Sequence, residues 1–354
     1  MKKKAGIWIG ALCISVVLLA LFSSCGNKAE KYSAHSFDYF DTVTTVMGYA
    51  SDREEFDRLC DEIFLMLEEY HKLFTIYDRY EGLNNLCTIN SLENGVHPTV
   101  RVDARIIDLL LYAKEMYEKT DGKMNIAMGS VLSLWHDYRQ RGLEAPLQAA
   151  LPPMERLLEA SAHTNIDDLL IDEANGTVTI TDPQMTLDVG AVAKGYAVEM
   201  TARALEEKGV TGYVINVGGN VRTIGEKDDG TPWRVGIENP DEESVEPYFA
   251  YLDLAGESVV TSGSYQRYYI VNGVSYHHII DPATLMPSEK YLSVSVICGN
   301  SADGDALSTA LFCMSAEDGL ALLGTLEGIE AMWVFPNGEK QYSDGFSDYT
   351  SKDR

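Results

Sequence analysis

Cysteine is scarce in this chain of 354 residues, and its six cysteines form no recognisable pattern. Cys13 lies in an N-terminal apolar run, and Cys25 follows that run closely. The remaining four show neither a CxxC pair nor the spacing of a metal site: Cys60, Cys87, Cys298 and Cys313. A chain of this length can bury enough apolar surface to fold without a disulfide framework. We therefore expect these four to be buried free thiols.

Basic residues are also few. The chain has 28 Lys and Arg against 54 Asp and Glu, which gives a formal net charge of −26. Such an excess of acid disfavours binding to nucleic acid or to an anionic membrane surface. It says little about chemistry, because most surface carboxylates only help to solvate the protein.

Long apolar runs are absent beyond the first segment, MKKKAGIWIGALCISVVLLALFSSCGNK. Its lysines, apolar stretch and small residues are typical of a secretory signal. The segment resembles the signal of bacterial lipoproteins, in which the cysteine after the cut is acylated, although Leu21 stands one place further from Cys25 than is usual. An uncleaved membrane helix is the alternative. Either interpretation places the body outside the cytoplasm.

The lipoprotein interpretation divides the N-terminal part into a signal peptide over 1–24 and a polar tether over 25–36. It predicts a lipid, such as palmitate, on Cys25 and attachment to a bacterial membrane, with the periplasmic face of the inner membrane as the expected place.

Helical and strand patterns mix without strict alternation in the rest of the chain, and no internal repeat or low-complexity block interrupts them. Five segments are typical of helices: 53–73, 103–119, 152–160, 191–209 and 303–314. Two Asn-Gly pairs predict hairpins, at residues 175–176 and 272–273. This mixture predicts an α+β fold, with one domain over 37–345 and a polar tail over 346–354.

A strand, a glycine turn and a helix follow one another in TLDVGAVAKGYAVEM. Asp188 ends the strand, and Lys194 lies one turn into the helix. Backbone N–H groups at such a helix start can hold a phosphate, but the P-loop pattern GxxxxGK[ST] is absent. A turn with only a folding role is the alternative. Gly218-Gly219 in INVGGN, after another strand, would let the backbone approach a ligand closely or would simply make a turn.

Asp305 and Thr309 lie four residues apart in SADGDALSTAL, so they share one face of a helix. A carboxylate and a hydroxyl are hard oxygen ligands, which suit a Mg²⁺ that keeps some waters and binds substrate phosphates. Asp303 would point elsewhere. The alternative is an acid favoured by the dipole at the helix N-terminus, with Thr309 packed in the core.

The stretch HHIIDPATLMP places His277 and His278 on opposite faces if it is a strand. One of them should then face inward. A histidine can move a proton at neutral pH, although a polar strand end closed by an Asp-Pro turn would have the same sequence.

The order of these motifs carries more information than any one of them. DVGAVAKGYA, INVGGN, VTSGSYQRYY, HHIIDP and DALSTAL occur in the order seen in the ApbE family, the FAD:protein FMN transferases, which the chain resembles from about residue 36 to 345. The resemblance implies an α+β fold, related to the T-fold, with mixed sheets, packed helices and an FAD cleft. It also implies Mg²⁺-dependent transfer of FMN from FAD to a threonine or serine hydroxyl of a target protein. A phosphoester forms, and AMP leaves.

The resemblance also implies partners and residue roles. The acceptors would be extracytoplasmic flavoproteins, such as Nqr- or Rnf-type subunits or FMN-binding domains. The metal ligands would be the Ala191 carbonyl oxygen, Asp305 and Thr309. His278 would accept the proton, with Asp281 and Asp305 as rivals. The residues implied to contact FAD are Met47, Tyr77, Lys123, Met124, Asn125, Asp188, Lys194 and Ile280.

The chain departs from the family pattern at four positions, where it has Asn125, Asn220, Ser264 and Leu285. Asn125 and Asn220 replace acids, and Leu285 replaces the glycine of DPxTG. These changes bear on FAD affinity more than on the reaction. Two other activities would suit much of the same sequence, a Mg²⁺-dependent FAD hydrolase that gives FMN and AMP, and a flavin-binding lipoprotein without activity. Asp305 and Thr309 argue against the second of these.

Overall fold

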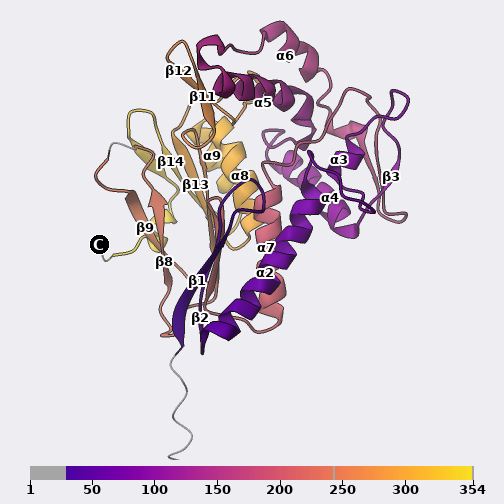
Figure 1. Cartoon of the computed structure of the whole chain (residues 1–354). Helices are drawn as coiled ribbons and strands as arrows, with labels where there is room; N and C mark the ends of the chain where they lie inside the picture. The colour runs from indigo at the N-terminus through magenta and orange to yellow at the C-terminus, as the bar shows by residue number, and fades with distance from the viewer. Residues whose placement is uncertain (1–28, 242–243, 353–354) are drawn as a thin grey trace, which may run out of the picture.

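The computed structural model describes residues 29–241 and 244–352. Its centre is an eight-stranded sheet in which every neighbouring pair is antiparallel (Figure 1). In spatial order the strands are β1 (Glu30–Ser36), β2 (Thr44–Ala50), β6 (Tyr213–Val217), β7 (Asn220–Ile224), β10 (Ser258–Gly263), β13 (Ser293–Cys298), β14 (Glu330–Val334) and β15 (Lys340–Tyr342).

Helices cover one face of this sheet: α2 (Arg53–Phe74), α7 (Ala193–Glu207) and α8 (Ser301–Cys313), with α4 (Ala104–Lys119) and α9 (Ala316–Leu323) further out. On α2 the buried residues Phe56, Cys60, Ile63 and Leu67 recur every three or four positions, which gives the helix one apolar stripe. In contrast, α8 is buried nearly all round, because α7 and the sheet enclose it.

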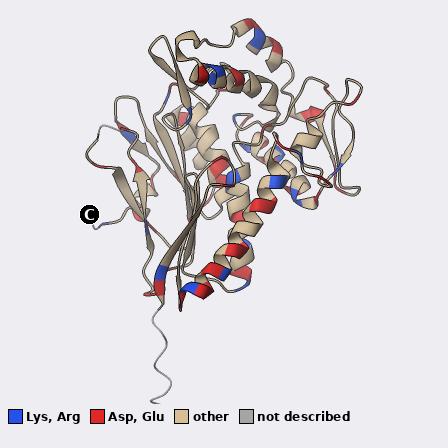
Figure 2. Cartoon of the chain, viewed as in Figure 1, with Lys and Arg blue, Asp and Glu red and all other residues tan. Residues whose placement is uncertain are grey.

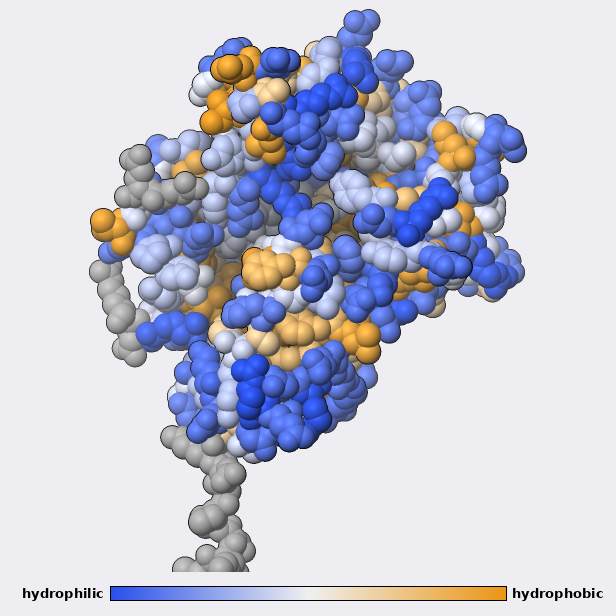
Figure 3. All heavy atoms as spheres, in the orientation of Figure 1, coloured by the Kyte–Doolittle hydropathy of each residue, from blue (hydrophilic) through white to orange (hydrophobic). Residues whose placement is uncertain are grey.

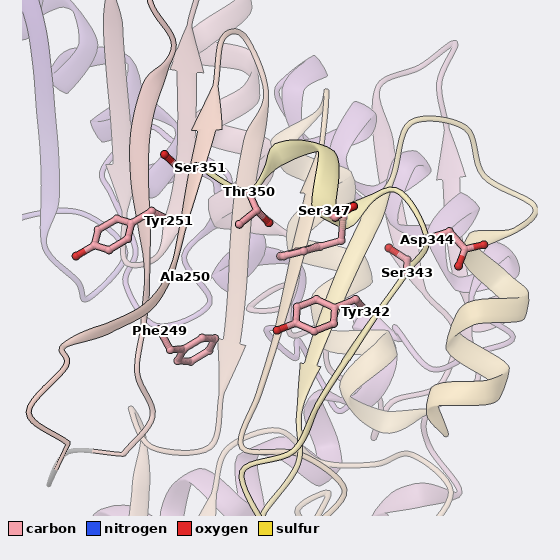
Figure 4. A pocket seen from close by; sticks show the side chains of 10 residues that line it. Phe249, Ala250, Tyr251, Tyr342, Ser343, Asp344, Ser347, Thr350 and Ser351 are labelled. Carbon is pink, nitrogen blue, oxygen red and sulfur yellow. The ribbon is translucent and has the colours of Figure 1, made fainter. Parts of the chain in front are cut away.

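The opposite face of the sheet carries the hairpin β8 (Trp233–Glu238) and β9 (Tyr248–Leu254) together with the short helix η4 (Phe346–Tyr349). Ile237 and Leu252 of the hairpin pack on Val259 and Ile297 of the sheet, and Phe346 is 1% exposed among them. Between β9 and the C-terminal segment lies a pocket of about 520 Å³, lined by aromatic and hydroxyl side chains and by Asp344 (Figure 4). It contains none of the predicted site residues.

A second apolar cluster joins α5 (Gly129–Glu144) and α6 (Met154–Ser161) to the hairpin β11 (Tyr268–Val271) and β12 (Val274–His277), at the top of Figure 1. A small sheet of β3 (Val100–Arg101), β5 (Thr177–Ile180) and β4 (Leu169–Asp172) lies to one side, near α3 (Leu86–Ile89). Three further short helices lie between these elements in the chain: η1 (Ile126–Met128), η2 (Pro146–Gln148) and η3 (Ile166–Asp168).

The predicted α+β class is confirmed, and both Asn-Gly pairs make hairpin turns. Two boundaries are wrong. Residues 30–36, expected in the tether, form β1, an edge strand whose alternate residues Tyr32 and Ala34 pack on the core. The expected polar tail is anchored by the buried Phe346. The predicted signal peptide and the lipidation at Cys25 lie outside the described residues.

Three of the four expected buried thiols are confirmed, Cys60, Cys298 and Cys313, whereas Cys87 is only half-buried. Acidic residues with a few basic ones between them colour α2 in Figure 2, and Arg53–Asp57 and Arg58–Glu54 form pairs one turn apart. Within the described residues, no helix combines the length and the apolar character that crossing a membrane requires.

Candidate active site

The helices α7 and α8 approach each other closely at Gly195. A Cβ atom there would lie 2.3 Å from the Ser301 carbonyl oxygen and 2.5 Å from Asp305 Cβ, so the approach requires glycine. The Gly195 N–H donates to Asp305 Oδ2 at 2.9 Å. Asp305 is 4% exposed, so the predicted metal ligand is held in one orientation at this junction.

The same contact frees a backbone oxygen. By the α-helical pattern the Gly195 N–H would donate to the Ala191 carbonyl, as the next residue's N–H donates to Val192 O at 3.0 Å. Because the Gly195 N–H donates to Asp305 instead, the Ala191 carbonyl oxygen is left available to another partner. Ala191 and Gly195 lie beside the glycine turn that was predicted from the sequence.

Lys194 and Thr309 belong to the same junction, and we call the group of Ala191, Lys194, Asp305 and Thr309 the corner. Lys194 Nζ lies 3.4 Å from Asp305 Oδ1 and donates to Gly190 O at 3.1 Å. Thr309 is half-buried one turn along α8 and makes no hydrogen bond with its side chain among the described residues. Asp303 points elsewhere, as expected, and accepts a hydrogen bond from Tyr112 Oη at 2.7 Å.

These donors fit a hard divalent cation. One carboxylate, one backbone carbonyl and one hydroxyl are the ligands that Mg²⁺ accepts while it keeps waters or phosphate oxygens. No group of three His, Cys, Asp or Glu side chains within 29–241 and 244–352 could hold a metal. A cation at this corner would therefore depend on the oxygens of Ala191 and Thr309 as well as on Asp305.

A buried ion-pair network supports the junction from behind. Glu199 of α7 is 1% exposed and accepts hydrogen bonds from the Ser301 N–H at 2.9 Å, Arg222 Nε at 3.2 Å and Arg203 Nε at 2.7 Å. Arg222 also reaches Glu206 at 2.9 Å. The sequence did not predict this network, because Glu199 and Arg222 meet only through the packing of α7 on β7.

The glycine turn is itself ordered by Asp188, whose Oδ1 accepts the Gly190 N–H at 2.8 Å. The Asp188 N–H donates to Ile126 O at 2.8 Å, which ties the turn to η1. Burial raises the pKa of Asp188, whereas the Gly190 N–H and the neighbouring side chains of His136, Lys194 and Arg267 oppose that rise. Asp188 and Lys194 therefore belong to one charged group.

The two histidines face opposite ways, as expected. His277 is 8% exposed, its Nε2 donates to Ser288 O at 2.8 Å, and its Nδ1 accepts the Ile279 N–H at 3.2 Å. His278 is exposed, and its Nδ1 lies 3.3 Å from Arg267 O. A carbonyl oxygen only accepts, so Nδ1 of His278 carries the hydrogen and Nε2 is free to accept a proton. His277 is structural, and His278 is the candidate base.

Loss of hydration and the charged groups around His278 keep it neutral. Partial loss of hydration lowers its pKa, and the charges of Arg267, His277, Lys194 and Arg139 lower it further. The rival Asp281 is 3% exposed and binds Lys123 at 3.1 Å and Lys290 at 2.8 Å. Burial raises the pKa of Asp281, but the bonds from Lys290, the Ala283 N–H and Lys123 outweigh burial and hold it below its usual range. Lys123 thus contacts Asp281 in this structure.

Aromatic and cationic side chains from distant segments stand near His278. Tyr77 is 60% exposed, and its ring lies 5.7 Å from the ring of His136. Arg139 contacts His136 at 3.3 Å, and Arg267 donates to Asp41 O at 3.1 Å. Neither guanidinium forms an ion pair with a carboxylate of the described residues. The surface is hollowed below the α5 and α6 region in Figure 3.

Four features near His278 were not predicted from the sequence: His136, Arg139, Arg267 and the turn at Phe40 and Asp41. Phe40 and Asp41 adopt positive φ angles of 55° and 51°, a backbone conformation that non-glycine residues rarely adopt. The pair stands directly before Thr42, where the chain turns into β2. Such strain gathers at functional sites, but nothing in a single sequence reports it.

Four of the residues implied to contact FAD are not part of this group. Met47 pairs with Val214 on the sheet face turned away from the helices. Met124 is fully buried in the main core, and Ile280 packs in the α5 cluster. Asn125 caps η1, where it accepts the Ala127 N–H at 2.8 Å and donates to Thr164 O at 3.0 Å.

The turn after His278 keeps its shape without the family glycine. Leu285 has φ = 60°, its N–H donates to Asp281 O at 2.8 Å, and its carbonyl accepts Trp135 Nε1 at 2.9 Å. The Leu285 side chain is 6% exposed in the α5 cluster. Burial of the leucine offsets the strain. The substitution therefore leaves intact the apolar cluster of α5, α6, β11 and β12 behind His278, which we call the wall.

These features define a class: an α+β protein in which a helix junction presents oxygen ligands and a lysine beside a group of aromatic and cationic side chains. Such a donor set suits a divalent cation and a phosphate-bearing ligand. The sequence profile of the ApbE family matches residues 40–333. The chain belongs to the ApbE family.

Its relatives agree in sequence and fold. A FAD:protein FMN transferase of Klebsiella pneumoniae (strain 342) is 33% identical over 79% of this chain and 83% of its own length. Another, from Treponema pallidum (strain Nichols), is 30% identical over 98% and 96%. The crystal structure of the ApbE protein of Thermotoga maritima MSB8 matches with a TM-score of 0.79 and 28% identity, over 91% of this chain and all of the other.

Proposed function

We propose that the chain is a FAD:protein FMN transferase, which transfers FMN from FAD to a threonine or serine hydroxyl of a target protein and releases AMP. One observation carries the proposal: the buried Asp305 carboxylate is fixed at the α7–α8 junction beside Lys194 and the available oxygen of Ala191. The relatives that match across most of both chains bear this name.

A bound Mg²⁺, held by Asp305, Thr309 and the Ala191 carbonyl oxygen, would neutralise the pyrophosphate charge that otherwise repels nucleophiles. Lys194 lies beside Asp305 and adds a positive charge to the same corner. Arg139 and Arg267 have no carboxylate partner among the described residues and are suited to further phosphate oxygens. The exposed ring of Tyr77 offers a surface on which a flavin could stack.

His278 is the base that we infer for the acceptor hydroxyl. Its Nε2 has no hydrogen, and its lowered pKa keeps it neutral at physiological pH. Asp281 is already engaged by two lysines, and Asp305 is engaged by Gly195 and Lys194. A positioned base typically contributes about 10²–10⁴-fold to such a step.

We further propose that the enzyme acts outside the cytoplasm, anchored by a lipid on Cys25, on extracytoplasmic flavoproteins. The N-terminal lysines, apolar run and Cys25 support the anchor. A Cys25→Ala variant should lose lipid-dependent partitioning into membranes, and unchanged partitioning would favour an uncleaved helix.

The test of the activity uses the full chain in detergent with FAD, Mg²⁺ and a threonine-bearing FMN-binding domain. In-gel flavin fluorescence after denaturation and AMP release are followed together. A fluorescent acceptor band that disappears with EDTA supports the transferase. AMP and free FMN without a labelled band, for several acceptor domains, would point to the hydrolase. FAD that stays intact would leave only a flavin-binding protein.

A further inference from the structure

Asn220 begins β7 and points at Asp305. Its side chain is 1% exposed, and its Nδ2 lies 3.4 Å from Asp305 Oδ1. Its Oδ1 is buried and has no hydrogen-bond partner among the described residues. A buried polar atom without a partner costs about 1–3 kcal/mol, so the present orientation of the amide satisfies only its Nδ2 end.

The two ends of the Asn220 amide can bind different partners. Nδ2 can donate to the carboxylate of Asp305, whereas Oδ1 can meet only a donor or a cation. Lys194 Nζ also lies 3.4 Å from Asp305 Oδ1. An ammonium and an amide N–H therefore share the carboxylate oxygen that a divalent cation would use.

We propose that Asn220 is a further oxygen ligand of the cation at this corner, either directly or through a cation-bound water. The inference rests on the proposed function, because it assumes that a divalent cation binds at Asp305. Asparagine oxygens are ordinary ligands of hard cations. A half-turn of the amide exchanges its two ends with little change of shape, and Asn220 then presents Oδ1 beside Asp305.

This assignment gives Asn220 a role beyond closing a turn. As a neutral ligand it adds no charge, so the corner keeps the single carboxylate of Asp305. An aspartate at the same place would add a second negative charge and should bind a divalent cation more tightly. The asparagine thereby tunes how strongly the site holds its metal.

The experiment measures Mn²⁺ binding to the full chain in detergent, without FAD, from the electron paramagnetic resonance signal of free Mn²⁺. Asn220→Leu keeps the approximate shape and removes the oxygen, and its Kd for Mn²⁺ should rise about 10- to 100-fold. Asn220→Asp should lower that Kd by about tenfold. Thr44→Val is the matched control, because Thr44 Oγ1 is another buried atom without a partner, on β2, two strands from Asn220 in the sheet. Its Kd should not change.

Several outcomes would overturn the inference. Kd values for both Asn220 variants within twofold of the unsubstituted protein would make Asn220 only a hydrogen-bond donor to Asp305. Weaker binding by a folded Asn220→Asp would do the same, and this variant decides the matter if Asn220→Leu does not fold. No saturable Mn²⁺ binding by the unsubstituted protein would remove the metal from the proposed function, and the inference with it. That result is distinct from unchanged variants of a protein that does bind.

Discussion

The α7–α8 junction and the wall behind His278 are built in opposite ways. At the junction, backbone contact at Gly195 and buried charges at Glu199, Arg222 and Asp305 fix each other. The wall is the apolar cluster of α5, α6, β11 and β12, and it presents its polar side chains to solvent. The difference teaches that the α7–α8 junction is held in one geometry, whereas the wall behind His278 can change residues, as at Leu285, without losing its shape.

The largest expected effect is on activity at the junction. Asp305→Ala should abolish Mg²⁺-dependent transfer, because it removes the carboxylate that the proposed metal would use, while FAD binding persists. Asp303→Ala is the control, since Asp303 lies on the same helix but bonds to Tyr112. The transfer rate and FAD binding, followed by fluorescence, are measured for both variants. Undiminished transfer by Asp305→Ala would remove this residue as a ligand.

The buried network behind the junction should show the next largest effect. Arg222→Met removes a buried partner of Glu199 and should cost about 3–5 kcal/mol in the free energy of unfolding. Arg203→Met removes a partner whose side chain is 52% exposed and should cost less than about 1 kcal/mol. Urea unfolding measures both. Similar costs for the two arginines would mean that burial does not distinguish them.

At the wall, His278→Ala should slow transfer by at least about 10²-fold while FAD affinity falls much less. Because the pKa of His278 is lowered in the folded protein, the histidine stays neutral below its ordinary value near 6.5. The rate of the unsubstituted enzyme should therefore not fall on the acid side until the pH is well below 6.5. A loss of FAD binding alone would make His278 a wall residue without a base role.

Gly195→Ala tests the backbone contact itself. The new methyl group would meet Ser301 and Asp305 at 2.3 and 2.5 Å, so α7 and α8 must separate, at a cost of about 1–3 kcal/mol and with weaker metal binding. Gly299→Ala is the control, because no atom lies within 4 Å of a Cβ at that position. Thermal melts and Mn²⁺ titration report both effects, and an unchanged Gly195→Ala protein would show that the helices have room to move.

The sequence predicted the local part of this site. Helical periodicity and spacing placed Asp305 and Thr309 on one face of α8, and alternation along a strand separated the two histidines. These features depend only on neighbours in the chain. Motif order supplied the family resemblance, and with it Ala191 and His278.

What the sequence could not predict depends on packing between distant segments. Arg222 meets Glu199 across helix and sheet, and Met47 proved to lie on the far face because β2 pairs with β6 in one register. The edge strand β1 was missed because a half-exposed strand, EKYSAHS, has too few apolar residues to reveal its pattern.

The smallest expected effect concerns the stability of variants at Leu285, where the usual order of glycine and alanine should be reversed. Glycine usually destabilises more than alanine, but Leu285 has φ = 60°, which costs a non-glycine residue about 1–2 kcal/mol. Leu285→Ala loses the buried side chain and keeps the strain, whereas Leu285→Gly loses the side chain and relieves the strain. Leu285→Gly should therefore be the more stable of the two by about 1 kcal/mol.

Leu157 is the matched control for that reversal, because it is fully buried in the same cluster but lies within α6. There the glycine variant should be less stable than the alanine variant by about 1 kcal/mol. Unfolding free energies of the four variants settle the matter. If alanine is the more stable replacement at both positions, the left-handed turn at Leu285 carries no strain. The wall would then tolerate its leucine for a different reason, namely a turn that relaxes around whatever side chain occupies it.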